Sequence, residues 1–308
     1  MNATKLFCIV GPTGSGKTYL SELLSEKIPV EIISADSRQI YKYLDIGTAK
    51  PSVDFLKKIK HHFIDSLTPT ENFNAGDFSV QAKKKIADIL LRQKIPLVVG
   101  GTGLYIRSLI DGIFEGPPAN DELRNKLFQK YQDEGGESLL RQLEKVDSDS
   151  AQKMLPTNKL RIVRALEVYL ITGKPISQLQ REQTNPISYE VQQVALLWDI
   201  KKLYQNINHR VEEMLEKGFV EEVISLQNKG FDSSLQSLQT VGYKEVFSYL
   251  HNEIPYKRMV ELIKQNSRRF AKRQMTWFRA DSRIQWYPIT NTKDFYKIAE
   301  QILRNFRL

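Results

Sequence analysis

The sequence predicts an α/β fold with a parallel sheet core and a mainly helical insertion. Over the first hundred residues, short apolar runs alternate with segments that have helical spacing. A glycine-rich loop connects the first apolar run to the first helical segment, and residues 117–193 carry several helical patterns but few strand signals. Alternating strands and helices with uniformly apolar strands are typical of a parallel sheet covered by helices on both faces.

Short apolar runs bounded by glycine, proline or polar residues predict the strands of the core. These runs are Leu6–Val10, Val30–Ser34, Pro96–Gly100, Val194–Ile200 and Ile284–Tyr287. Residues at helical spacing predict the core helices, which are Thr18–Glu26, Asp77–Arg92, Leu203–Lys217, Pro255–Arg283 and Lys293–Phe306. We expect Asp77 to be a helix N-cap and Gly218 to end the helix that precedes it.

The pattern changes after residues 116–118, which are Gly-Pro-Pro. Two amphipathic helices are predicted beyond this point, Asp121–Gln132 and Lys159–Ile171. Strand character returns at Val194. We therefore predict a core made of residues 1–116 and 194–308, interrupted by a helical insertion over residues 117–193.

The composition is that of a globular protein, with 41% hydrophobic and 26% charged residues among 308. It excludes a disordered or fibrous chain. The single cysteine, Cys8, excludes a disulfide framework and favours a reducing compartment, and we expect it to be a small core residue of the first strand. No apolar run approaches the ~20 residues that span a bilayer. We therefore expect a cytoplasmic protein without membrane contact.

The glycine-rich loop matches the pattern G-x-x-x-x-G-K-[ST] between the first strand and the first helix. Its residues are Gly11, Pro12, Thr13, Gly14, Ser15, Gly16, Lys17 and Thr18. In this context the loop N–H groups and the helix N-terminus surround phosphate oxygens, Lys17 adds a point charge, and Thr18 offers a hydroxyl to Mg²⁺. The core is therefore predicted to be of the P-loop (NTPase-like) type, as in nucleotide-binding and ATP-binding proteins, with Mg²⁺ as cofactor.

A hydrolase or kinase of this type also needs an acid at the end of a second apolar strand. The strand that ends at Gly100 continues instead as Gly101-Thr102-Gly103, without an acid. The carboxylate that closely follows an apolar strand is Asp36. This arrangement favours diphosphate binding without hydrolysis, and it counts against a P-loop kinase or an RNA-binding ATPase.

The helix predicted over Pro255–Arg283 is strongly basic, which suggests a surface for the phosphate backbone of a nucleic acid. Its cations are Lys257, Arg258, Lys264, Arg268, Arg269, Lys272, Arg273, Arg279 and Arg283. Against them stand Glu261 and Asp281, so this helix carries +7 of the net charge of +9. A solvated face normally alternates acids with bases. Phe270 and Trp277 lie among the cations, either to stack on bases or, more commonly for Trp277, to anchor the helix.

Several motifs together resemble the tRNA dimethylallyltransferase (isopentenyltransferase) family, in its bacterial form. They begin at Asp36 (DSRQIY), Asp45 (DIGTAKP), Gly100 (GGTGLY), Arg164 (RALEV), Val241 (VGY) and Lys272 (KRQMTWFR). The resemblance covers residues 6 to about 280. It implies transfer of the dimethylallyl group of dimethylallyl diphosphate to N6 of the adenosine 3′-adjacent to the anticodon of tRNA (adenosine 37), with release of diphosphate.

The resemblance also implies roles for individual residues. Asp36 corresponds to the general base, Thr102 lies near the reacting base, and Arg210 helps to bind the diphosphate or line the reaction channel. Gly14, where many relatives have alanine, is an innocuous difference. The residues expected to contact tRNA are Asp36, Ser37, Arg38, Gln39, Thr102, Arg124, Arg161, Arg164, Arg268, Arg269, Lys272 and Arg273.

Alternative roles and functions remain open at the level of sequence. Asp36 could be a structural N-cap or ion-pair acid, and Thr102 a turn residue. An isopentenyltransferase acting on free adenine nucleotides would share the P-loop and the acid. The helical insertion and the basic helix favour the anticodon stem-loop of tRNA as acceptor, because a mononucleotide needs neither. We expect a monomer.

Overall fold

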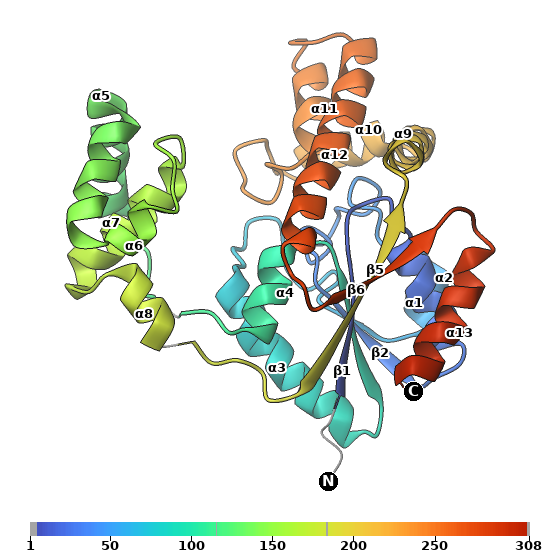
Figure 1. The fold of residues 1–308 in the computed structure, drawn as a ribbon. Coiled ribbons are helices and arrows are strands. Elements are labelled where there is room, and N and C mark those ends of the chain that lie inside the picture. Colours follow the sequence, from blue (N-terminus) through green and yellow to red (C-terminus); the bar gives the residue numbers. More distant parts are fainter. Residues whose placement is uncertain (1–4, 115, 183, 307–308) are drawn as a thin grey trace. The chain divides into compact units, whose positions relative to one another are not determined.

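A computed structural model describes residues 5–114, 116–182 and 184–306 and divides the chain into two compact units (Figure 1). The core unit contains Met1–Ile110 and Ser188–Leu308, and the insertion unit contains Asp111–Ile187. The insertion therefore begins and ends six residues earlier than the 117 and 193 expected from sequence. Its end shifts because the following strand begins in a polar segment that has no apolar run to mark it. The first four and the last two residues of the predicted core lie outside the described residues.

The core unit contains a fully parallel sheet of six strands in the order β3-β2-β4-β1-β5-β6, which confirms the predicted fold class. The strands are β1 (Lys5–Val10), β2 (Val30–Ser34), β3 (His61–His62), β4 (Ile95–Gly100), β5 (Glu190–Trp198) and β6 (Ile284–Ile289). The sequence analysis missed β3, because two histidines carry no strand pattern. The polar start of β5 pairs with β1, where Glu190 lies opposite Lys5 and Gln193 opposite Cys8.

Helices cover the sheet and extend beyond the carboxyl ends of its strands. Figure 1 shows α3 (Ala75–Leu91) and α4 (Gly103–Ile110) on one face, and α1 (Lys17–Ser25) and α13 (Asp294–Phe306) on the other. The remaining helices are α2 (Val53–Lys58), α9 (Ile200–Glu216), α10 (Phe219–Asn228), α11 (Tyr243–Leu250) and α12 (Tyr256–Arg279). Of these, α9 to α12 gather near the carboxyl ends of the strands, where ligands bind in open parallel sheets.

One hydrophobic core lies between the sheet and the helices α1 and α13. Ile9 of β1, Leu20 of α1 and Ile302 of α13 are fully buried in it. β1 is apolar along nearly its whole length because both of its faces are covered. Cys8 is fully buried, as expected, and burial raises the pKa of its thiol to about 12.

Three helix ends differ from the sequence expectation. Asn74, not Asp77, is the N-cap of α3. Asp77 is its third helical residue and accepts a hydrogen bond from the Asn74 N–H, which completes a capping box. Asp199 caps α9, accepting hydrogen bonds from the N–H groups of the residues two and three positions on. This cap makes β5 end at Trp198. The basic helix α12 ends at Arg279, four residues before the expected end.

The insertion unit is helical and has its own core. Its helices are α5 (Asp121–Val146), α6 (Ser148–Ala151), α7 (Lys159–Thr172) and α8 (Ile176–Glu182). Leu139 and Leu143 of α5 are buried with Ile162 of α7. α5 extends well past the predicted end, through a break at Gly135, whose φ of +80° a residue with a side chain rarely adopts.

None of the helices in the described part of the chain is long and apolar enough to cross a membrane.

Candidate active site

The P-loop lies between β1 and α1, as the sequence predicts, and close packing explains its glycines. Gly14 and Gly16 have φ values of +76° and +91°. A Cβ at Gly14 would lie 2.8 Å from Ile207 of α9, and one at Gly16 would lie 2.3 Å from Phe295. Both glycines have a backbone conformation that favours glycine, and a Cβ at either position would crowd a neighbouring side chain, so Gly14 fits this turn as expected.

One cavity of about 500 Å³ connects the P-loop to the ends of β2 and β4. It is lined by predicted site residues, which are Thr13, Lys17, Thr18, Asp36, Ser37, Arg38, Gln39, Thr102, Arg210 and Arg273. Apolar side chains of α9 form part of the same wall, namely Ile207, Val211 and Met214. The cavity thus combines an ionic end, a carboxylate and an apolar surface.

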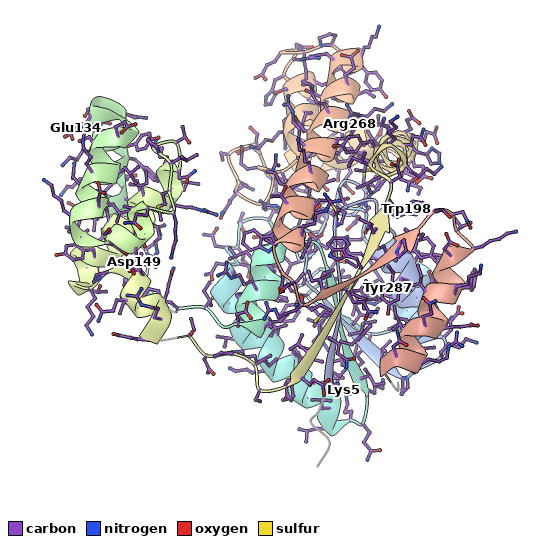
Figure 2. All side chains as sticks on the ribbon, viewed as in Figure 1. Lys5, Glu134, Asp149, Trp198, Arg268 and Tyr287 are labelled. Carbon is purple, nitrogen blue, oxygen red and sulfur yellow. The ribbon has the colours of Figure 1, made fainter. Side chains whose placement is uncertain are left out.

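A second hollow, of about 660 Å³, lies beside the ends of β5 and β6. Its lining is mainly apolar and includes Trp198, which Figure 2 labels at the end of β5. Trp198 donates a hydrogen bond through Nε1 to the Ser15 carbonyl, 3.0 Å away, and so supports the P-loop from outside. The smaller cavity is the candidate site because it holds the cations and the acid.

The P-loop end of the cavity holds two cations that have no carboxylate within 4 Å among the described residues. Lys17 Nζ donates to the Pro12 carbonyl at 2.7 Å, and Arg210 Nη1 donates to Thr13 Oγ1 at 3.0 Å. Desolvation by burial, then the charge of Arg210, lowers the pKa of Lys17 to about 7, although Asp36 opposes the shift. Burial also lowers the pKa of Arg210. This end is suited to an anion such as a diphosphate.

The other end is organised around Asp36, which lies two residues after the end of β2. Asp36 Oδ1 accepts hydrogen bonds from the N–H groups of Arg38 at 2.9 Å and Gln39 at 3.3 Å. Asp36 therefore stabilises a turn and does not cap a helix. Thr102 Oγ1 accepts a hydrogen bond from the Ser37 N–H at 3.0 Å, which ties the two loops together. Asp36 is half-buried and lines the cavity, so it can contact a ligand there.

Arg38 and Gln39 extend from the same turn into protein contacts. Arg38 Nη1 donates to the Gln236 carbonyl at 2.8 Å, and Gln39 Nε2 donates to the Thr48 carbonyl at 3.2 Å. Both side chains line the cavity while bracing loops that surround it. Their predicted contacts with tRNA stay predictions.

The donors present fit a magnesium ion that arrives with a diphosphate. Thr18 is exposed at the start of α1 and lines the cavity, where its hydroxyl can coordinate an ion. No cluster of His, Cys, Asp or Glu suited to hold a metal occurs among the described residues. Mg²⁺ usually keeps several waters and binds through substrate phosphates with few protein ligands. The Mg²⁺ assignment stays a prediction.

The basic helix α12 has an anchored side and an exposed side. A Cβ at Gly103 would lie 2.2 Å from Trp277, so this tryptophan packs against the glycine-rich turn and anchors the helix. Arg268, labelled in Figure 2, donates through Nη1 to Asn208 Oδ1 of α9 at 2.6 Å. Arg269 and Lys272 are exposed.

Phe270 and Arg273 meet at the rim of the cavity. The Arg273 guanidinium lies 5.7 Å from the centre of the Phe270 ring, and Phe270 is 39% exposed. Both residues line the cavity, so α12 forms part of its wall.

Two of the three arginines predicted in the insertion are engaged with an acid of the same unit. Arg124 Nε lies 2.9 Å, and Arg164 Nη1 lies 2.7 Å, from the carboxylate of Glu167, which is fully buried. The Asn120 N–H also donates to this carboxylate. Arg161 is exposed. The structure thus gives Arg124 and Arg164 a role inside the insertion, and all three tRNA contacts stay predictions.

Sequence reasoning missed two residues that hold the site together. Glu222 of α10 accepts hydrogen bonds from the backbone N–H groups of residues 45–47 and from the Tyr243 hydroxyl. This fixes the loop whose Thr48 carbonyl receives a hydrogen bond from Arg210 Nη2 at 3.4 Å. Glu222 had no signal of its own, being one acid on an amphipathic helix. The second residue is Gln274, a neutral side chain in the motif that begins at Lys272, where the cations and aromatic residues carry the stronger functional signal.

The fold and the cavity define a P-loop-type α/β protein in which the cations of the loop and a carboxylate line the same cavity, an arrangement suited to a group-transferring enzyme. The sequence model of the IPP transferase family matches residues 39–281. The chain belongs to the IPP transferase family.

Curated relatives match nearly the whole chain. The tRNA dimethylallyltransferase 1 of Citrifermentans bemidjiense is 46% identical over 287 residues, covering 92% of each chain. The tRNA dimethylallyltransferase of Geobacillus thermodenitrificans is 43% identical and covers 97% of this chain and 95% of its own.

Two solved structures share the fold. The tRNA isopentenylpyrophosphate transferase of Bacillus halodurans has a TM-score of 0.72 at 35% identity, covering 98% of this chain and 97% of its own. A eukaryotic dimethylallyltransferase acting on tRNA has a TM-score of 0.80 at 28% identity, covering 97% of this chain and 77% of its own.

Proposed function

We propose that this protein transfers the dimethylallyl group from dimethylallyl diphosphate to N6 of adenosine 37 in tRNA. The single observation that carries the proposal is the shared cavity, in which the P-loop cations and Asp36 line one volume of about 500 Å³. Its relatives are named tRNA dimethylallyltransferases, which supports the same reaction. An N6–C1 bond forms, the C1–O bond to the diphosphate breaks, and one proton leaves N6.

The donor substrate is held at two points. Lys17 and Arg210 bind the diphosphate and stabilise the negative charge that grows on it as the C1–O bond breaks. The five-carbon group lies along the apolar wall of α9, formed by Ile207, Val211 and Met214. The Thr18 hydroxyl would help to hold a Mg²⁺ ion, which would supply positive charge to the diphosphate.

Asp36 accepts the proton from N6. The lone pair of an exocyclic adenine amine is delocalised into the ring, so the amine becomes a competent nucleophile only as its proton leaves. The oxygen of the base must therefore lie within about 3 Å of N6. Adenosine 37 must also leave the stacked loop to enter the cavity. The loops around Asp36 and Thr102 are tied together and would orient the extruded base.

The acceptor is the anticodon stem-loop of tRNA. The exposed cations of α12 and the helical insertion support a large polyanionic acceptor over a free adenine nucleotide. β4 ends in glycines without an acid, which counts against a P-loop kinase. A monomer in the cytoplasm is expected to carry out the reaction.

The test is incubation of the purified protein with dimethylallyl diphosphate and unmodified tRNA, and separately with ATP alone or with AMP as acceptor. We expect diphosphate release that requires tRNA, and N6-dimethylallyladenosine in the digested tRNA. Steady ADP production from ATP, or prenylation of AMP faster than that of tRNA, would exclude the proposed reaction.

A further inference from the structure

Gln274 of α12 connects the P-loop to the glycine-rich turn through both ends of its side-chain amide. Its Oε1 accepts a hydrogen bond from the Thr13 N–H at 2.8 Å, and its Nε2 donates to the Gly101 carbonyl at 2.8 Å. The residue is 8% exposed and lines the cavity. One buried side chain thus joins two loops that are far apart in sequence.

The packing around this amide leaves little freedom for either loop. A Cβ on Gly101 would lie 2.4 Å from Gln274 Nε2 and 3.2 Å from the Gly11 carbonyl oxygen. The two loops and the amide are therefore in direct contact. An amide fits both partners, because one end must accept from an N–H group and the other must donate to a carbonyl.

Besides its contact with Gln274, each loop contacts residues of the candidate site. Thr13 Oγ1 accepts the hydrogen bond from Arg210, at the diphosphate end. Gly101 precedes Thr102, whose hydroxyl holds the Ser37 N–H next to Asp36. Gln274 thus lies between the diphosphate-binding end of the cavity and the carboxylate end.

We infer that Gln274 is a positioning residue that sets the separation between the leaving diphosphate and the attacking amine. The inference rests on the proposed function. Transfer requires the amine and the allylic carbon to approach within about 3–3.5 Å, and a misplacement of about 1 Å can cost 10²-fold in rate. Gln274 touches neither reacting atom; it acts through the two loops that hold them.

A purely structural role predicts a different outcome from a positioning role. Loss of two buried hydrogen bonds would lower stability in either case. Only a positioning residue would slow the chemical step while both substrates still bind.

Two variants of Gln274 separate a structural role from a positioning role. Gln274→Met keeps the approximate volume and removes both hydrogen bonds, whereas Gln274→Glu keeps the acceptor and loses the donor whenever the carboxyl group is ionised.

The experiment measures single-turnover transfer with saturating dimethylallyl diphosphate and unmodified tRNA, below the melting temperature of each variant. Gln274→Met should be about 10²-fold slower than wild type, with dissociation constants for both substrates changed less than about threefold. The control is Gln265→Met, a half-buried residue of the same helix that is not among the residues lining the cavity, and it should transfer at the wild-type rate.

The pH profile of Gln274→Glu supplies the second readout. As the pH falls, the acid form can donate its O–H to the Gly101 carbonyl while its other oxygen accepts from the Thr13 N–H. The rate relative to wild type at the same pH should therefore rise towards one as the pH falls. This profile decides the matter if Gln274→Met does not fold.

A wild-type rate for Gln274→Met overturns the inference, as does a loss that lies entirely in substrate affinity, or a relative rate of Gln274→Glu that is constant with pH. In each of these cases the wild-type protein still modifies tRNA. A wild-type protein that releases no diphosphate with tRNA would instead overturn the proposed function, and this inference with it.

Discussion

Two pairs of cations in this chain have opposite surroundings. Lys17 and Arg210 line the cavity and donate to carbonyl and hydroxyl oxygens, with no carboxylate within 4 Å among the described residues. Arg124 and Arg164 of the insertion lie 2.9 and 2.7 Å from the buried carboxylate of Glu167. The first pair has only neutral oxygen partners, whereas the second pair has a carboxylate.

The difference indicates what each pair does. A desolvated cation without a counter-ion is unstable as an ion, as the lowered pKa of Lys17, about 7, reflects. A bound diphosphate would supply the missing charge. Around Glu167, burial alone would raise the pKa of the carboxyl group, but hydrogen bonds from Arg164, the Asn120 N–H and Arg124 lower it. That cluster is satisfied without a ligand, which is typical of a structural role.

Substitution of Asp36 is the strongest test of the comparison. The charge of Asp36 acts to raise the pKa of both Lys17 and Arg210, although Asp36 forms an ion pair with neither. If Asp36 is the base, Asp36→Asn should slow single-turnover chemistry at saturating tRNA by about 10²–10⁴-fold. Both substrates should still bind, because the amide keeps the shape of the side chain. If Asp36 were instead the counter-ion of the cations, the variant would bind inorganic diphosphate more tightly and react at the wild-type rate.

Lys17→Ala should lower the rate of transfer by about 10²–10³-fold, equivalent to about 2.7–4 kcal/mol, because it removes one preorganised donor to the leaving group. The melting temperature should change little, because the lost hydrogen bond to the Pro12 carbonyl is offset by no longer burying a cation without a counter-ion. Lys201→Ala, at an exposed position of α9, is the control. Turnover by Lys17→Ala close to that of Lys201→Ala would show that the unpaired cation is not used in the reaction.

The lowered pKa of Lys17 predicts proton uptake when diphosphate binds. Below about pH 7 Lys17 is already ionised in the free protein, and no proton is taken up. Above that pH the neutral amine must gain a proton to pair with the anion, so affinity should fall by up to about tenfold per pH unit. Calorimetry with inorganic diphosphate at about pH 8, in buffers of different ionisation enthalpy, measures the uptake. Lys17→Ala corrects for protons exchanged by the diphosphate, and equal uptake in both proteins would contradict the prediction.

The sequence predicted the elements that neighbouring residues determine, but it did not predict which side chains contact one another in the fold. The P-loop, β1 and α1 are determined by neighbouring residues, and their positions were correctly predicted. Glu167 lies three residues after Arg164, yet nothing in the pattern showed that it would be buried with both arginines. Contacts over long sequence separations, such as that between Gln274 and Thr13, 261 residues apart, have no periodic signal and required the fold.

On the structural side of the comparison, Glu167→Gln should destabilise the insertion. Removing one partner of a fully buried ion pair costs about 3–5 kcal/mol. The arginine side chains are 34% and 31% exposed, so solvent reduces this to about 1–3 kcal/mol. Amide hydrogen exchange in α5 and α7 measures the loss, with Glu137→Gln, at an exposed position of α5, as control. Equal protection in the two variants would mean that the cluster does not stabilise the unit.

The smallest expected effect is on the salt dependence of tRNA binding, and it compares the exposed cations of α12 with the paired arginines of the insertion. Arg269 and Lys272 of α12 are exposed and have no carboxylate within 4 Å among the described residues, so they are free to contact phosphates. Each lost contact should reduce the slope of log K for tRNA against log salt by about 0.7–0.9, because fewer counter-ions are released. Arg269→Gln with Lys272→Gln should therefore reduce the slope by about 1.4–1.8 and leave the affinity for dimethylallyl diphosphate unchanged.

The matched variant is Arg124→Gln with Arg164→Gln, which removes the same charge from the insertion. Because these guanidinium groups already pair with Glu167, few phosphate contacts are lost, and the slope should change by less than in the α12 variant. Filter-binding titrations from about 50 to 200 mM salt, where phosphate contacts have a large effect, measure both slopes. If the insertion variant loses as much slope as the α12 variant while its α5 and α7 amides stay protected, Arg124 and Arg164 bind tRNA directly despite Glu167. In that case, pairing with an internal acid does not distinguish structural cations from binding cations in this protein.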